Sequence, residues 1–150
     1  MHALTIDNML HFMADPKMKA LSQVPLFSHA TKKELEFIAR EGDEVDMPAG
    51  KTLTREGKPG DTFYVVLDGQ AEVMIGGRRR RVLEAGDFFG EISMIDRGMA
   101  TATVTTLTPA RMFVMSHAQF RDAIKGSDSL MVKVLMAMGE RLRADIAAQA

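Results

Sequence analysis

Residues 88–104 have the sequence FFGEISMIDRGMATATV, and this stretch decides the fold around it. It predicts a short helical turn that the chain enters through Gly90 and that interrupts a series of strands. The first backbone N–H groups of such a turn lack partners and, with the aligned peptide dipoles, favour a negative group beside them. The carboxylate of Glu91 cannot bind an anion, so we expect it to accept a hydrogen bond from a sugar hydroxyl. Phosphate and sugar together indicate a nucleotide site.

Short strands separated by turns surround this stretch from residue 44 to residue 116. Gly76 and Gly77 stand where a two-residue hairpin turn needs positive φ. In two of the strands apolar residues alternate with polar or edge positions, and we assign to the inward faces Phe63, Val65 and Leu67 in one strand and Ala71, Val73 and Ile75 in the other. This pattern is typical of a β-sandwich or β-roll.

Helical patterns precede and follow the strands. Residues 6–13 carry apolar side chains at helical spacing, with Pro16 as the stop. Thr31 and Glu34 predict a capping box for a second helix. After the strand that ends at residue 116, a short helix stops at Gly126, and Ser127 or Asp128 caps a long final helix.

Composition bounds the class of protein. The 150 residues suffice for one globular domain, with 19 Lys and Arg against 20 Asp and Glu, so no strong positive field attracts nucleic acid. No apolar run approaches the length of a membrane span, and no signal peptide precedes the first helix, so we expect a cytoplasmic protein without membrane contact. The absence of cysteine excludes disulfides, thiol catalysis and Cys-based metal sites.

The sequence FGEIS at residues 89–93, followed by ATV at residues 102–104, resembles the phosphate-binding cassette of the cyclic-nucleotide-binding family. The similarity extends through the turns of the strand region and covers about residues 20–147. It implies a mainly β fold with flanking helices: an eight-stranded antiparallel β-roll (jelly roll) with N-terminal helices, a short phosphate-cassette helix and a C-terminal helical lid. We assign residues 1–19 to an N-terminal helical extension and residues 20–150 to the domain.

The resemblance also implies the site. Backbone amides around Gly90, Ile92 and Ser93 would line the phosphate, and Glu91 would bind the ribose 2′-hydroxyl. Thr101 would add its amide and hydroxyl, and a threonine here can meet the 2-amino group of guanine, so the expected ligand is cAMP or cGMP. The complete expected cyclic-nucleotide site comprises Phe89, Gly90, Glu91, Ile92, Ser93, Ala100, Thr101 and Ala102, with Arg141, Leu142 and Arg143 as lid contacts to the base.

The chain departs from the family pattern at Ala100, where relatives hold an arginine that pairs with the cyclic phosphate. Losing one member of a desolvated charge pair costs about 2–5 kcal/mol, so we expect weakened phosphate binding. Three accounts stay open: the amides bind weakly alone, another arginine such as Arg97 replaces the lost one, or Ala100 was introduced to disable the site.

Two other charged features have plainer interpretations. The run Arg78–Arg81 predicts a solvated edge strand, partly neutralised inward, rather than a lipid or nucleic-acid patch, because alternate side chains of a strand fall on opposite faces. The four histidines lack the spacing of metal ligands, so we expect no metal and no cofactor.

The final helix carries an apolar stripe, Met131, Leu135, Met138 and Leu142, joined by Val134 and Ile146. We expect packing on the roll to cover most of it. Its length, and the pairing of relatives through this helix, also favour a homodimer or contact with an unknown effector protein.

The leading hypothesis is therefore a regulatory module without enzymatic activity and without a DNA-binding domain, whose final helix responds to a cyclic nucleotide. A ligand-free interaction or dimerisation scaffold of the same fold is the alternative, supported by Ala100. A cupin-type enzyme would need a metal triad or an acid–base pair, and the sequence displays neither.

Overall fold

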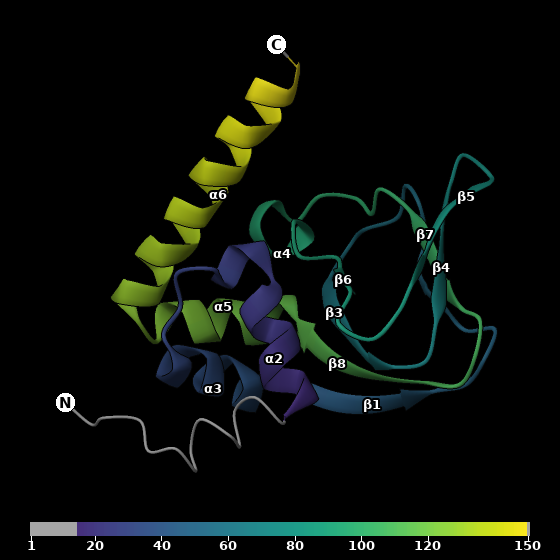
Figure 1. The fold of residues 1–150 in the computed structure, drawn as a ribbon, viewed down its shortest axis with the longest axis horizontal. Coiled ribbons are helices and arrows are strands. Elements are labelled where there is room, and N and C mark those ends of the chain that lie inside the picture. Colours follow the sequence, from purple (N-terminus) through teal and green to yellow (C-terminus); the bar gives the residue numbers. More distant parts are fainter. Residues whose placement is uncertain (1–14, 150) are drawn as a thin grey trace.

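Two antiparallel sheets and a helical layer form the part of the chain that the structure, a computed structural model, describes: residues 15–149 (Figure 1). The first sheet has the order β1-β8-β3-β6, with β1 Asp43–Met47, β8 Ala110–Ser116, β3 Thr62–Asp68 and β6 Phe88–Phe89. The second has the order β2-β7-β4-β5, with β2 Thr52–Thr54, β7 Thr103–Thr106, β4 Ala71–Ile75 and β5 Arg78–Leu83. The predicted eight-stranded antiparallel roll is confirmed.

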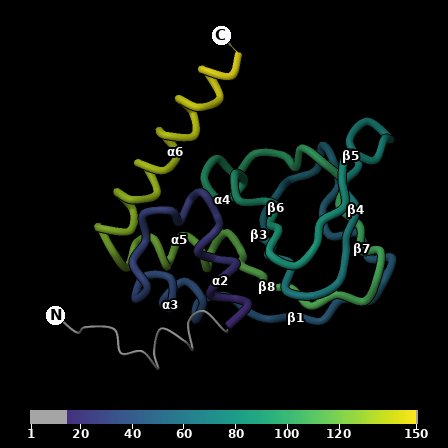
Figure 2. Tube along the Cα trace, in the orientation of Figure 1, coloured from purple at the N-terminus to yellow at the C-terminus, as the bar shows by residue number. Residues whose placement is uncertain are grey.

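The helices gather at one end of the roll, and the last of them rises away from it (Figure 2). They are α2 Pro16–Gln23, the 3-10 turn η1 Pro25–Phe27, α3 Lys32–Glu41, α4 Ser93–Asp96, α5 His117–Lys125 and α6 Asp128–Gln149. The predicted helix at residues 6–13 lies outside the described residues. The expected boundary between residues 19 and 20 falls inside α2, and the division into an extension and a domain stays a prediction.

Local capping signals locate the helix ends correctly. Thr31 and Glu34 form the predicted capping box, with N–H···O distances of 3.2 and 2.9 Å. Ser127 caps α6, because its Oγ accepts a hydrogen bond from the Leu130 N–H at 3.1 Å. Pro16 begins α2 as its first residue, behind the N-cap Asp15, and the helix that it was expected to stop lies outside the described residues.

Strand β3 is buried on both faces, which corrects the assignment of its inward side. Phe63 and Val65, expected to face the interior of the roll, lie in the cluster shared with the helices. Tyr64 and Val66 instead face the core between the two sheets. Residues of β3 do alternate between two faces, but this alternation does not indicate which face the helices will cover.

Helix α6 is attached to the rest of the molecule mainly through its first half. Its buried residues are Leu130, Val134 and Ala137. The prediction that packing on the roll covers most of the apolar stripe is wrong, because the exposed fractions of Leu135, Leu142 and Ile146 are 61%, 61% and 59%. Within residues 15–149, no helix combines the length and apolarity that crossing a membrane requires.

Candidate functional site

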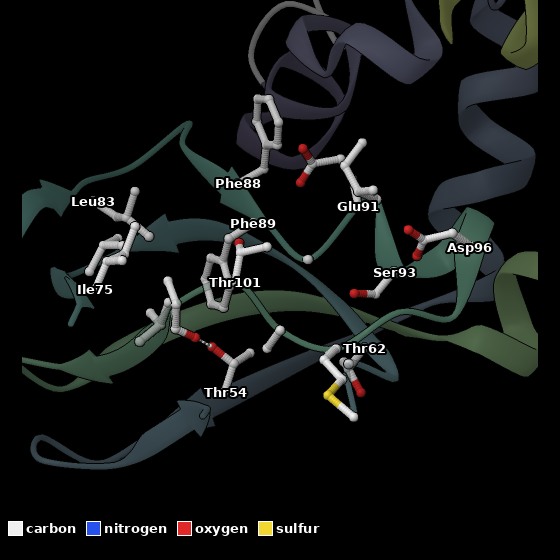
Figure 3. Close-up of a pocket in the computed structure, with 18 of the residues that line it drawn as sticks. Thr54, Thr62, Ile75, Leu83, Phe88, Phe89, Glu91, Ser93, Asp96 and Thr101 are labelled. Atoms are coloured by element: carbon white, nitrogen blue, oxygen red, sulfur yellow. Dashed lines mark hydrogen bonds between the residues drawn. The ribbon is translucent and has the colours of Figure 1, made fainter. Parts of the chain in front are cut away.

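A cavity of about 330 Å³ opens between the sheets beside α4, a size that suits a small organic ligand (Figure 3). Figure 3 shows Ser93 and Asp96 at one end of it, Leu83 and Ile75 at the other, and Phe89 and Thr101 between them. The structure brings together in its lining every cassette residue named from the sequence: Phe89, Gly90, Glu91, Ile92, Ser93, Ala100, Thr101 and Ala102.

Gly90 ties this segment to the central strand. Its φ is +84°, and a Cβ at this position would collide with the backbone carbonyl oxygen of Thr62. The preceding residue, Phe89, stacks on Tyr64 with ring centroids 4.7 Å apart and an interplanar angle of 10°. Burial raises the pKa of Tyr64, so its hydroxyl stays neutral at physiological pH, and it donates a hydrogen bond to the Leu53 carbonyl at 3.4 Å. The two residues that lead into the turn, Phe89 and Gly90, therefore pack against β3.

The turn itself leaves donors available. Within residues 15–149, the backbone N–H groups of Gly90, Ile92 and Ser93 have no acceptor in the protein. The turn is closed by Arg97, whose φ is +55° and whose N–H bonds the Ser93 carbonyl at 3.0 Å. Unpaired amides at the start of a helical turn can receive an anion.

Glu91 is a buried carboxylate at the same end of the cavity, with 9% of its surface exposed. Its partner is Arg141 of α6, whose Nη1 lies 3.4 Å from the Glu91 Oε1. Of the three expected lid residues, Arg141 alone contacts the cassette. Leu142 is 61% exposed, and none of the three, Arg141 included, lines the cavity.

Ala100 lines the cavity and is fixed by its backbone, because its N–H bonds the Lys58 carbonyl at 2.8 Å and its carbonyl accepts from the Gly57 N–H at 2.9 Å. Arg97, the substitute cation considered from the sequence, is absent from the cavity lining. Arg81, which was predicted to lie on a solvated edge strand, is in that lining.

The opposite wall of the cavity was not predicted from the sequence. Thr54, Val73, Ile75, Arg81, Leu83 and Val104 line it from the second sheet. The alternation of Ala71, Val73 and Ile75 was a usable signal for β4, since Ala71 is buried and Val73 packs against the core between the sheets. Across residues 15–149, no three His, Asp or Glu side chains converge in a way that could hold a metal ion.

Comparison with known proteins gives a consistent picture. Residues 44–127 match the sequence profile described as "Cyclic nucleotide-binding domain". The "CRP-like cAMP-activated global transcriptional regulator" of Mycobacterium tuberculosis (strain ATCC 25618 / H37Rv) is 28% identical over 131 residues, which cover 82% of this chain and 57% of that protein. A "cAMP-dependent protein kinase regulatory subunit" of Emericella nidulans is 31% identical over 113 residues, covering 74% of this chain and 27% of that protein. The chain thus spans little more than half of one relative and about a quarter of the other.

Among solved structures, the crystal structure of the N-terminal domain of a transcriptional regulator from Streptomyces coelicolor A3(2) has a TM-score of 0.76 and 29% identity. The similarity covers 84% of this chain and 94% of that one. The Thermus thermophilus Catabolite Activator Protein, at a TM-score of 0.65 and 23% identity, shares the fold.

Substituting Gly90 with alanine tests the attachment of the turn to β3. We expect Gly90→Ala to lower the free energy of unfolding by at least about 1 kcal/mol more than Gly50→Ala, because an added methyl group must displace the Thr62 carbonyl. Gly50 is the matched control: its φ is +76°, and an added Cβ there would meet nothing within 4 Å. Urea unfolding followed by circular dichroism measures both, and equal losses would contradict the contact.

Proposed function

The chain belongs to the cyclic-nucleotide-binding domain family, and from that premise we propose that it is a sensor module that binds cAMP or cGMP in the cavity beside α4. The family is regulatory rather than catalytic. The observation that carries the proposal is the juxtaposition, at one end of the cavity, of unpaired amides at Gly90, Ile92 and Ser93 with the buried carboxylate of Glu91.

Each of these groups has a role that matches its chemistry. The amides of Gly90, Ile92 and Ser93 receive the cyclic phosphate, since amide N–H groups only donate. Glu91 accepts a hydrogen bond from the ribose 2′-hydroxyl. The amide and hydroxyl of Thr101 add donors beside the phosphate, while Phe89 and Ala102 give the ligand apolar contact.

Ala100 makes this a weakened site. An arginine side chain at this point of the lining would pair with the phosphate, whereas the methyl group of Ala100 leaves the amides to bind it alone. The missing pair lowers affinity by a factor of about 30 to 3,000, which corresponds to about 2–5 kcal/mol.

Restoring the arginine tests the proposal. We expect Ala100→Arg to bind cAMP or cGMP at least about tenfold more tightly than the unmodified chain in calorimetry at constant salt, because it supplies the missing charge pair. Ala49→Arg is the control, since it makes the same substitution at an exposed residue outside the cavity lining, and we expect a much smaller gain. If neither the unmodified chain nor Ala100→Arg binds either nucleotide, the site assignment is contradicted.

The proposal includes a response of α6 to ligand. The guanidinium of Arg141 lies 3.4 Å from the Glu91 carboxylate, the group that the ribose would use. A ribose hydroxyl on Glu91 competes with Arg141. The part of α6 before Arg141 is held by its buried residues and by two ion pairs, Lys133–Glu34 at 2.6 Å and Glu140–His29 at 2.7 Å. Binding therefore shifts the position of the second half of α6.

Distance measurements test this shift. The chain contains no cysteine, so spin labels at Arg78→Cys and Leu142→Cys report only the separation of β5 and α6. We expect saturating cyclic nucleotide to change that separation by at least about 2 Å, and the pair Lys51→Cys and Arg78→Cys, with both labels on the roll, to stay unchanged. Ligand binding measured by calorimetry without any change in the first pair would contradict the response.

A dimerisation or effector-binding scaffold is the second candidate function. The exposed apolar side chains of α6 favour it: Met131, Val132, Leu135, Met136, Leu142 and Ile146. A contiguous apolar surface on one helix is typical of a protein contact, and a second copy of α6 would cover it symmetrically. This candidate needs no nucleotide and is compatible with Ala100.

Light scattering tests the self-association. We expect the chain to have twice its monomer mass at high concentration and Leu135→Glu to reduce it to the monomer, because a charge would be buried in the contact. Ala144→Glu, on an exposed position of the same helix outside the apolar stripe, should leave the dimer intact. A monomer at all concentrations would contradict self-association and leave an effector protein as the partner.

A further inference from the structure

The loop between β2 and β3 brings a lysine next to Ala100. This loop runs antiparallel to the end of the cassette segment, with Pro59 and Met99 as bridge partners. The Ala100 N–H bonds the Lys58 carbonyl at 2.8 Å, and the Gly57 N–H bonds the Ala100 carbonyl at 2.9 Å. Two residues of the loop, Gly57 and Lys58, therefore oppose the single residue Ala100.

This arrangement is a β-bulge whose first residue is a glycine. Gly57 has a φ of +79°, the left-handed conformation that such a bulge requires. The next residue, Lys58, closes a turn through its N–H, which bonds the Arg55 carbonyl at 3.0 Å. Residues that oppose each other in an antiparallel pair project from the same face, with Cβ atoms about 5 Å apart. The side chain of Lys58 therefore leaves the loop beside the methyl group of Ala100.

Lys58 lines a second cavity, which adjoins the first. This second cavity has a volume of about 230 Å³ and follows the edge strand β2. Three residues line both cavities: Thr54, Gly60 and Thr62. Gly60 also holds the loop against the cassette, because a Cβ at this position would collide with the Ser93 Oγ. Lys58 thus lies at the border of the two cavities, at the end where the unpaired amides are.

The ammonium group of Lys58 is available to a ligand. It is exposed and has no hydrogen bond or ion pair to any other residue that the structure describes. The carboxylates nearest to it in sequence have other partners. Glu56 accepts a hydrogen bond from the Gly76 N–H at 2.9 Å. Asp61 accepts one from the Thr62 hydroxyl at 3.0 Å.

The arginines that line the two cavities are placed differently. Arg81 lines the first cavity from β5, the strand of Leu83, and Figure 3 shows Leu83 at the end opposite Ser93. Arg55 lines the second cavity, but its backbone makes no hydrogen bond to Ala100. Neither guanidinium is fixed beside the phosphate-binding end as the lysine is.

From this placement we propose that Lys58 binds the cyclic phosphate and supplies part of the charge that Ala100 does not. The proposal rests on the proposed function and adds a cation to the amides that bind the phosphate there. An ammonium is a compact charge with three rotatable donors on a flexible four-carbon stem, so it can reach an anion from the adjacent segment. It lacks the planar fork with which an arginine binds two phosphate oxygens at once. Lys58 therefore recovers only part of the affinity, and Ala100→Arg still gains more.

A double-mutant cycle tests the contact. Dissociation constants for cAMP and cGMP are measured at low salt by NMR titration, because amide chemical shifts also report weak binding. We expect Lys58→Ala to weaken both nucleotides by at least about fivefold, since a charge-assisted hydrogen bond to the phosphate is lost. In the Ala100→Arg background, where the arginine already pairs with the phosphate, the same substitution should change affinity by less than about twofold.

Two further variants are the controls. Lys51→Ala removes the same charge from an exposed residue that lines neither cavity, and Arg55→Ala removes a charge from the second cavity alone. Both should leave the affinities unchanged, and thermal denaturation should show all variants equally folded. Equal losses in the three single variants would indicate a general effect of charge and overturn the contact, as would a loss in Arg55→Ala without one in Lys58→Ala.

The outcomes separate the contact from the proposed function. If neither the unmodified chain nor Ala100→Arg binds a nucleotide, the proposed function fails, and the contact fails with it. If Ala100→Arg binds while the unmodified chain does not, or if Lys58→Ala binds as tightly as the unmodified chain, the function stands and Lys58 supplies no cation to the phosphate.

Discussion

The burial of strand β3 on both faces is the constraint on which the rest of the structure depends. Phe63 joins the helical layer, where it meets the ring of Phe27 edge-on at 6.1 Å, and Val66 is fully buried in the core between the sheets. The same strand offers the Thr62 carbonyl, against which Gly90 lies without room for a side chain. A single strand thereby sets the positions of the helices, the second sheet and the cassette relative to one another.

What the sequence could predict was local. The capping box at Thr31 and the positive φ of Gly76 and Gly77 depend on a few adjacent residues, and the structure has all of them. The helix at Pro16 was missed although Asp15-Pro16 is an N-terminal signal, because the proline was interpreted as a stop for the segment before it.

The cassette segment was found as a contiguous motif, but its surroundings depend on contacts distant in sequence. Arg81 reaches the cavity only through the register of β5 on β4, which shifts between Val73 and Met74. No local pattern in a run of four arginines says which one faces inward. The pairing of Glu91 with Arg141 spans fifty residues and follows from the direction in which α6 leaves the domain.

The way α6 is anchored has a mechanical meaning. Its last buried residue is Ala137, and its last ion pairs with the rest of the domain are those of Glu140 with His29 and of Arg141 with Glu91, so the turns after Arg141 project beyond their support. A helix of 22 residues is about 33 Å long. Arg141 contacts Glu91 at the last turn of α6 that is attached to the domain. A small displacement at that point is amplified along the turns that follow, so Gln149, at the far end of α6, travels further than any atom in the cavity has to move.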